Sequence, residues 1–320
     1  MKKKEKKTIQ PVSGTKVPRF AGPSTFARLP ELRDVENCDV AIVGIPFDAG
    51  TSYRPGARFG PQSIRQASRH LRTNYHPNYD SEPFVEQQVA DAGDITCNPF
   101  NIDEAITQIE DGACDLLDKV GGIISMGGDH TIAFPLLKAM NKKNNGPVAL
   151  VHFDAHLDTW DTYFGAPYTH GTPFRRAREE NLFMDNASMH VGIRGPLYSR
   201  EDLKNDASFG FKIIHCDEFQ SQGTDKIAGR IRERVGDNPL YLSIDIDVLD
   251  PAFAPGTGTP EIAGMTTREM VNVLRGLSGM NLISADVVEV SPAYDHAEVT
   301  SLAAATIIYE LTNLFAKKKQ

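Results

Sequence analysis

Short, nearly continuous runs of apolar and β-branched residues recur along the chain and constrain its fold more than any other feature. A strand that is buried on both faces of a sheet requires such a run, whereas a half-solvated strand alternates apolar and polar residues. The clearest run is DVAIVGI, and the weakest is at residues 87–90. We interpret as strands the runs at residues 39–45, 87–90, 122–126, 148–153, 189–193, 211–214, 240–244 and 282–290. The sequence therefore predicts eight strands in a largely parallel sheet.

Amphipathic helical patterns lie between several of these strands. In residues 103–120, apolar side chains repeat every three or four positions, so one face of the predicted helix is apolar. We expect Asp103 to be the N-cap of this helix, and Thr266 with Glu269 predicts a capping box in another. Further helices are predicted at residues 62–72, 225–235, 266–277 and 301–315. The alternation of strands and helices indicates an α/β fold with helices on both faces of the sheet.

The first 20 residues differ in composition from the rest of the chain. They begin MKKKEKK, and no apolar segment follows, which argues against a secretory signal peptide. We expect residues 1–20 to form a flexible basic N-terminal segment. No linker, repeat or low-complexity segment interrupts residues 21–320, which we expect to form a single domain.

Charge and cysteine usage narrow the class of protein. The 34 Lys and Arg residues against 42 Asp and Glu residues give a net charge of -8, whereas nucleic-acid-binding proteins usually present a basic surface. The four cysteines have neither CxxC nor zinc-site spacing, so we expect reduced thiols in a cytoplasmic protein. No apolar run approaches the ~18 residues of a membrane span. We therefore expect neither a nucleic-acid nor a membrane partner.

Histidines and carboxylates directly follow three of the predicted strands. The segments are GGDH at residues 127–130, DAHLD at 154–158 and DID at 245–247. Ligands of parallel sheets bind beyond the carboxyl ends of the strands, so these side chains are expected to converge. The candidate metal ligands are His130, Asp154, His156, Asp158, Asp245 and Asp247.

The spacing and chemistry of this set predict two divalent metal ions. Residues two apart point to the same side of an extended backbone, as in Asp154 with His156 and Asp245 with Asp247. Any one of the segments could be a capping or solvated turn. Four carboxylates in one place, however, repel one another unless cations are present. Oxygen and nitrogen ligands without thiolates suit Mn²⁺ better than structural zinc. Since two metals can ionise a shared water, the pattern predicts a metal-dependent hydrolase.

Three further features of the sequence lie outside these clusters. His170 follows Asp158 by 12 residues and is a candidate general acid or base, although such a histidine can also cap a helix. Glu289 ends the last long apolar run, either as an anchor for a cationic substrate or as an ordinary strand-end charge. Residues 250–260 (DPAFAPGTGTP) predict a rigid loop, which either lines the site or is a structural crossover.

These motifs together resemble the ureohydrolase family of arginases and agmatinases, and its agmatinase-like subgroup in particular. The segments that carry the resemblance are GGDH, DAHLD, HGTPF (170–174) and SIDIDVLDPAFAPGTGTPE (243–261), and it extends over nearly the whole chain from about residue 18. It implies a three-layer α/β/α fold with a central eight-stranded mostly parallel sheet, and two Mn²⁺ ions per subunit. It assigns His130, Asp154, Asp158 and Asp245 to one ion, and Asp154, His156, Asp245 and Asp247 to the other.

The resemblance also implies a reaction and roles for residues. A water activated by the metals would attack the guanidinium carbon of the substrate, and Asp158 would orient it. His170 would shuttle a proton to the leaving amine, Glu289 would pair with the planar guanidinium, and Thr259 would lie near the reacting end. The products would be urea and a primary amine. A homotrimer or homohexamer is implied as well.

Agmatine, which would yield putrescine and urea in polyamine biosynthesis, is the substrate that we expect from this resemblance. Residues 159–169 lack the asparagine-rich stretch with which arginases hold an α-amino acid. The alternatives are guanidinobutyrase, guanidinopropionase and proclavaminate amidinohydrolase activities, whose substrates carry a carboxylate tail. The loop residues that could meet the tail are Arg54, Arg58, Tyr163 and Tyr168.

Two readings from other classes fit the sequence less well. A metal-binding protein that has lost activity would lack a ligand or His170, and all of these residues are present. A histone-deacetylase-like amidohydrolase would carry tandem histidines before the metal cluster, and the sequence has none there.

Overall fold

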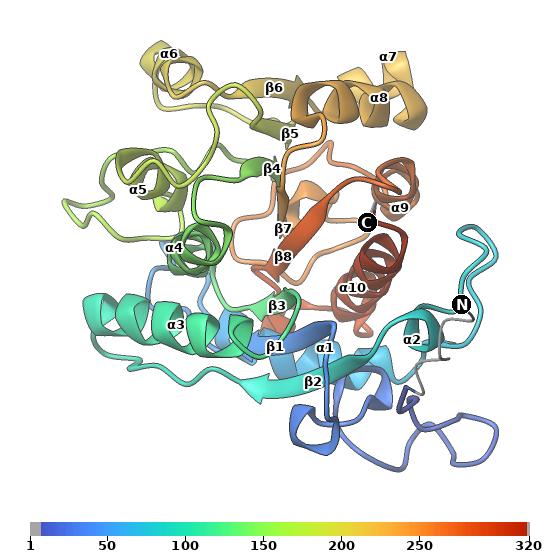
Figure 1. Cartoon of the computed structure of the whole chain (residues 1–320). Helices are drawn as coiled ribbons and strands as arrows, with labels where there is room; N and C mark the ends of the chain where they lie inside the picture. Colours follow the sequence, from blue (N-terminus) through green and yellow to red (C-terminus); the bar gives the residue numbers. More distant parts are fainter. Residues whose placement is uncertain (1–7, 319–320) are drawn as a thin grey trace.

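Eight parallel strands form one central sheet within residues 8–318, the part of the chain that the computed structural model describes (Figure 1). Their order is β2-β1-β3-β8-β7-β4-β5-β6. The strands are β1 (Val40–Ile45), β2 (Val89–Asp94), β3 (Ile123–Gly127), β4 (Ala149–Phe153), β5 (Met189–Ile193), β6 (Lys212–His215), β7 (Leu240–Asp245) and β8 (Leu282–Val288). Every predicted strand is present, and all of the pairings are parallel.

The central strands are buried on both faces, as their apolar sequences predict. Strands β3, β4 and β7 are buried at every position. The register between neighbours aligns their carboxyl ends, because Phe153 pairs with Ile244 and Asp245 pairs with Val288. The ends of β3, β8, β7 and β4 consequently lie side by side at one edge of the sheet.

Helices cover both faces of the sheet and complete the three-layer α/β/α architecture (Figure 1). One face carries α3 (Ile102–Leu117), α4 (Ala133–Asn144) and α5 (Pro173–Glu179), which pack on one another in that order. The other face carries α1 (Gly60–Ser68), α8 (Thr224–Val235), α9 (Thr267–Gly276) and α10 (Val299–Lys317). The shorter α-helices are α2 (Pro83–Glu86), α6 (Arg200–Ser208) and α7 (Glu218–Gln222).

Six 3₁₀ turns in the described residues connect these elements. They are η1 (Phe26–Arg28), η2 (Leu32–Asp34), η3 (Ala57–Phe59), η4 (His130–Ile132), η5 (Ile246–Val248) and η6 (Pro292–Tyr294). Two of them, η4 and η5, directly follow β3 and β7, where the sequence places candidate metal ligands. The chain therefore turns sharply at both of these strand ends.

The predicted helix caps were right for one helix and wrong for another. Thr266 and Glu269 form the capping box expected at the start of α9. The N-cap of α3 is Asn101 rather than Asp103, since the Asn101 side chain accepts a hydrogen bond from the backbone N–H of Glu104. Asp103 lies in the first turn, where a negative charge still interacts favourably with the helix dipole.

Helix α10 is long and apolar enough to cross a membrane by length and composition alone, contrary to the sequence-based expectation that no segment approaches a membrane span. However, 78% of its most apolar window is buried inside the protein. It packs against α1, α9 and β8. Its apolar composition is therefore explained by its place in the core.

The described part of the N-terminal segment is attached to the domain. The backbone N–H of Ile9 donates to the side chain of Gln88, and that of Val12 donates to the carbonyl of Arg28. The side chain of Arg69 donates to the carbonyl of Arg19. Three hydrogen bonds thus connect this part of the segment to the domain, and the flexibility expected for residues 1–20 stays a prediction. The basic run at residues 2–7 lies outside the described residues.

Candidate metal centre and active site

Three strand ends at one edge of the sheet bring the six predicted metal ligands together. His130 begins η4 after β3, Asp245 ends β7, and Asp247 lies in η5. The segment that follows β4 supplies Asp154, His156 and Asp158. Strands β7 and β4 are neighbours, and β8 separates them from β3. The convergence expected from the parallel sheet is present.

The first group of candidate ligands surrounds the imidazole of His130. Its Nδ1 atom lies 3.2 Å from an oxygen of Asp154, 2.9 Å from an oxygen of Asp158 and 3.3 Å from an oxygen of Asp245. The opposite nitrogen, Nε2, lies 2.8 Å from the hydroxyl oxygen of Ser243. Since Ser243 engages Nε2, the side of the ring that bears Nδ1 is left to face the three carboxylates.

The second group surrounds the imidazole of His156. Its Nδ1 atom lies 3.2 Å from Asp154 and 3.2 Å from Asp247. The carboxylate of Asp154 also accepts the backbone N–H of His156, and that of Asp245 accepts the backbone N–H of Asp247. These short-range hydrogen bonds fold each pair into a turn that directs both side chains to one side. Asp154 contacts both histidines and so belongs to both groups.

The chemistry of this set fits two divalent cations. The four carboxylates are at most 5% exposed. Burial and then the charge of neighbouring carboxylates raise the pKa of Asp245 well above its usual range, and they raise that of Asp247 to about 6. Burial lowers the pKa of His130 and of His156, but the surrounding carboxylates raise both well above the usual value. Protons thus offset part of the negative charge, and cations could replace them.

His170 lies beside this centre and connects two other segments. Its Nδ1 atom is 3.0 Å from Oε1 of Glu289, and its Nε2 atom is 2.6 Å from the hydroxyl of Ser52. Burial lowers the pKa of His170, yet Glu289 and the more distant carboxylates Asp158 and Asp129 raise it to about 9. Sequence reasoning identified His170 and Glu289 but not Ser52.

Glu289 has one engaged and one free oxygen. Oε1 accepts hydrogen bonds from the backbone N–H of His130 and faces Nδ1 of His170. Oε2 is buried and has no partner among the described residues. The backbone of Glu289 has a φ of 65°, a conformation that is uncommon for a non-glycine residue and clusters at functional sites.

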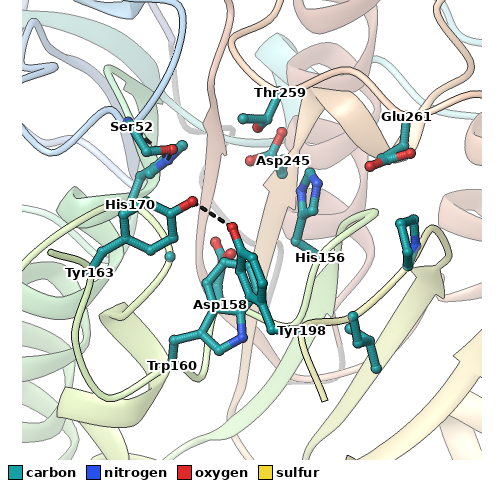
Figure 2. Close-up of a pocket in the computed structure, with 13 residues that line it drawn as sticks. Ser52, His156, Asp158, Trp160, Tyr163, His170, Tyr198, Asp245, Thr259 and Glu261 are labelled. Carbon is teal, nitrogen blue, oxygen red and sulfur yellow. Dashed lines mark hydrogen bonds between the residues drawn. The ribbon is translucent and has the colours of Figure 1, made fainter. Parts of the chain in front are cut away.

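A cavity of about 320 Å³ opens over the metal centre (Figure 2). Thr259 lies in its wall, and its hydroxyl donates to Asp247 across 3.3 Å. Figure 2 shows Glu261 on the far side of His156 from Tyr163 and His170. The residues that line the cavity are Ser52, His156, Asp158, Trp160, Tyr163, His170, Gly171, Pro196, Leu197, Tyr198, Asp245, Thr259 and Glu261. The 250–260 loop therefore contributes to the site wall.

Of the four loop residues considered for the substrate tail, Tyr163 alone is among those that line the cavity. Its hydroxyl lies 2.7 Å from that of Tyr198. Tyr168 stacks on Phe134 instead. The guanidinium of Arg58 pairs with Asp48, and Arg54 lies against tyrosine rings outside the cavity.

Sequence reasoning missed the buried polar residues behind the ligands. His152 lies 2.8 Å from Asp154 and, by distance alone, could itself hold a metal with His130 and Asp158. We assign it as a hydrogen-bond partner of Asp154, because its other nitrogen is engaged by His190. The sequence signal that could have identified His152 is its position two residues before Asp154, in the segment HFDAH.

Asp129, in the GGDH segment, was also missed. Its carboxylate accepts the backbone N–H groups of Gly50 and Thr131. It thereby fixes the loop that carries Ser52 to His170. Burial, followed by the charge of Glu289, raises the pKa of Asp129 to about 7.

Known proteins resemble this chain over most of its length. Residues 38–313 match the Arginase family. Guanidinopropionase of Pseudomonas aeruginosa is 44% identical, with 96% of each protein covered. Mitochondrial agmatinase of Gallus gallus is 41% identical over 94% of this chain and 88% of that protein. The structure of proclavaminate amidinohydrolase from Streptomyces clavuligerus superimposes with a TM-score of 0.89 and 40% identity, over 94% of this chain and 99% of that one. The chain therefore belongs to the arginase family and is a ureohydrolase, which acts on C–N bonds of guanidino compounds.

Proposed function

We propose that the protein is a manganese-dependent agmatinase, which hydrolyses agmatine to putrescine and urea in the cytoplasm. Manganese is favoured because the ligand set combines carboxylate oxygens with imidazole nitrogens and has no thiolate. His130, Asp154, Asp158 and Asp245 would hold one ion. Asp154 and Asp245, together with His156 and Asp247, would hold the other.

The charge of the cavity wall is the observation that favours agmatine as the substrate. No lysine or arginine occurs among the described residues that line the cavity. Apart from the metal ligands and His170, its one charged side chain is Glu261, and the carboxylate of Glu261 has no hydrogen-bond or ion-pair partner among the described residues. Agmatine carries an ammonium group at the end opposite its guanidinium. An acidic wall favours such a cation over a carboxylate.

Arg194 does not offset the charge of this wall. Arg194 precedes the Pro196–Tyr198 stretch of the lining, but its guanidinium donates to main-chain carbonyls, among them those of Asp247 and Glu261. These hydrogen bonds direct the cation into the protein. A substrate carboxylate in the cavity would thus lack the bidentate partner that an arginine provides.

The side chains around the centre can then share the reaction. When bound, the two metal ions would supply a water that ionises near neutral pH. Asp158 lines the cavity and can orient the attacking water. His170 also lines it and, with a raised pKa, can deliver a proton to the leaving amine. The free Oε2 of Glu289 is available to accept a guanidinium N–H.

The second candidate function is hydrolysis of a guanidino acid. It is favoured by the relatives named guanidinopropionase and guanidinobutyrase, which are 44% and 43% identical to this chain. These proteins are as similar to this chain as the relatives named agmatinase. The two functions share the metal centre and differ at the substrate's tail.

Urea release from a panel of substrates distinguishes the two. The Mn²⁺-loaded protein is assayed with agmatine, 4-guanidinobutyrate, 3-guanidinopropionate, arginine and free guanidine. We expect the highest kcat/KM with agmatine. A higher value with either guanidino acid would replace the agmatinase proposal by the second candidate. No urea from any substrate would contradict the proposed reaction, and Mn²⁺ binding measured in parallel tests the metal separately.

A further inference from the structure

A chain of four buried side chains runs from the metal centre toward the edge of the sheet. Nε2 of His152 lies 2.8 Å from Oδ2 of Asp154, and Nδ1 of His152 lies 2.7 Å from Nδ1 of His190. Nε2 of His190 lies 3.0 Å from Oδ1 of Asp206. All four residues are completely buried, yet only Asp154 is one of the predicted ligands.

Helix α6 shows that these four side chains do more than pack the core. Asp206 is the one buried residue of α6, so the helix meets the interior through a carboxylate and not through an apolar side chain. Oδ1 of Asp206 also accepts a hydrogen bond from Thr159, whereas Oδ2 has no partner among the described residues. Burying a carboxyl group is costly, and packing alone would favour an apolar residue at this position.

The backbone and two phenylalanines fix the geometry of the imidazoles. His152 and His190 are register partners on β4 and β5. The ring of Phe174 lies 4.3 Å from that of His152, and the ring of Phe211 lies 3.9 Å from that of His190. A phenylalanine ring thus packs against each imidazole and restricts its rotation. The positions of the four nitrogens are therefore set by the fold.

The direction of the hydrogen bonds follows from counting protons. When Asp154 is a carboxylate, it accepts the Nε2–H of His152, and Nδ1 of His152 must then accept the Nδ1–H of His190. A neutral His190 that keeps this proton has a bare Nε2, so Asp206 must share a further proton with that atom. Without this third proton, lone pairs would face each other between Nε2 of His190 and Asp206, across 3.0 Å. If the His190 proton moved to Nε2 instead, they would face each other between the two Nδ1 atoms, across 2.7 Å.

We propose that His190 and Asp206 are positioning residues of the metal centre, which act through His152 to hold Asp154 in its ligating orientation. One oxygen of Asp154 lies 3.2 Å from Nδ1 of His130, and the other lies 3.2 Å from Nδ1 of His156. A carboxylate that serves both metal positions must keep its plane fixed. The hydrogen bond from His152 supplies this constraint, as outer hydrogen-bond partners do at metal sites.

The first test replaces His190 by phenylalanine and compares the variant with a matched control. His190→Phe keeps an aromatic ring but removes both hydrogen bonds. The control, His76→Phe, removes a buried histidine that pairs with Glu310 of α10 across 3.1 Å and contacts no predicted ligand. Mn²⁺ affinity and the number of ions bound are measured by competition with a chelator and by elemental analysis. The melting temperature is measured on the metal-free proteins.

We expect His190→Phe to weaken Mn²⁺ binding by about 10- to 100-fold, the cost typical of removing an outer hydrogen-bond partner. His76→Phe should lower the melting temperature of the metal-free protein and leave Mn²⁺ affinity at the parental value. Parental affinity in a destabilised His190→Phe would overturn the inference, because it would reduce His190 to a packing role.

A second pair of variants, at Asp206, tests the inference even if His190→Phe fails to fold. Asp206→Asn keeps the size of the side chain, and its amide N–H can donate to Nε2 of His190, which leaves the Nδ1 proton in place. Asp206→Leu cannot. We expect weaker Mn²⁺ binding in Asp206→Leu than in Asp206→Asn, and equal affinity in both variants and the parent would overturn the inference.

The inference rests on the two-metal centre of the proposed function and not on agmatine. Mn²⁺ binding by the parent protein tests the proposed metal, whereas the ratio between each variant and the parent tests the positioning role. The proposed metal and the proposed positioning role can therefore fail separately.

Discussion

Nδ1 of His170 lies 3.0 Å from Oε1 of Glu289, and this contact joins two segments that are 119 residues apart in the sequence. It places the candidate proton carrier from the loop after β4 against the carboxylate that directly follows β8. Ser52, from a third segment, engages the other nitrogen of the ring. The position of His170 thus depends on three separate segments that meet at one edge of the sheet.

The contact predicts a pH dependence of stability. Burial lowers the pKa of His170, but Glu289 raises it to about 9, above the ~6.5 of an unfolded histidine. A raised folded-state pKa means that the stabilisation is fully present below pH ~6.5 and is lost as the pH rises through ~9. Since one pKa unit corresponds to about 1.4 kcal/mol, the effect is on the order of 3 kcal/mol.

Urea unfolding of the metal-free protein and of His170→Asn checks this expectation. The stability difference between them should be larger at pH ~6 than at pH ~9.5, by up to about 3 kcal/mol. His296→Asn, at an exposed histidine away from the site, is the control. A difference that stays constant between the two pH values would show that the pair does not stabilise the protonated imidazole.

Replacing Asp247 by alanine should remove one metal ion and the activity. Asp247 is fully buried and contacts His156, so the second group loses a ligand that no neighbour can replace. We expect about one Mn²⁺ per subunit and a loss of kcat greater than the ~100-fold that outer partners of metal ligands can cost. Elemental analysis and urea release measure the two effects.

Asp250→Ala is the matched control for this variant. Asp250 follows closely in the same segment, but its carboxylate accepts the backbone N–H groups of Ala252 and Gly264. The control should keep both ions. An active Asp247→Ala protein with two ions would contradict the ligand assignment.

The acidic cavity wall predicts a selective effect on substrate binding. In Glu261→Gln, the KM for agmatine should rise by about 2- to 5-fold with kcat little changed, since a partly exposed ion pair contributes up to about 1 kcal/mol. Butylguanidine, which has the same guanidinium and a neutral tail, should be hydrolysed with parental KM. An equal rise in KM for both substrates would mean that Glu261 does not interact with the ammonium group.

The convergence of the candidate metal ligands was predictable because their clusters lie at the ends of apolar runs that must be buried strands. The parallel order of the sheet then brings three strand ends together without any knowledge of side-chain positions. By contrast, the series of hydrogen-bonded side chains that links His152 through His190 to Asp206 could not be predicted. His190 occupies an ordinary strand position in MHVGI, and Asp206 lies in a polar helical segment. Their contact depends on the register between β4 and β5 and on how α6 packs.

The capping of α3 and the role of Asp129 show the same limit. Asn101 and Asp103 are both good N-cap residues, and the choice depends on the path of the preceding turn. In the sequence, Asp129 is interpreted as part of a turn beside His130. Its contact with Gly50 could not be predicted, because it requires the loop after β1 to approach the end of β3. Local sequence carries the residue types, whereas tertiary packing selects their partners.

Two glycines with different surroundings should respond in opposite ways to a methyl group. A Cβ at Gly50 would overlap the hydroxyl of Thr131, beside Asp129 and the backbone of His170. A Cβ at Gly229, in the middle of α8, would meet nothing within 4 Å. Gly229→Ala should therefore stabilise the protein by about 0.5–1 kcal/mol, because alanine loses less conformational entropy in a helix.

Gly50→Ala should destabilise the protein by about 1–3 kcal/mol, the usual cost of overpacking a tight site. Because the same loop positions Ser52 against His170, this variant should also lower kcat. Urea unfolding and urea release on both variants provide the measurements. If Gly50→Ala kept parental stability and kcat, the loop would have room to move, and the tight contact between this loop and the GGDH segment would not be needed to place His170.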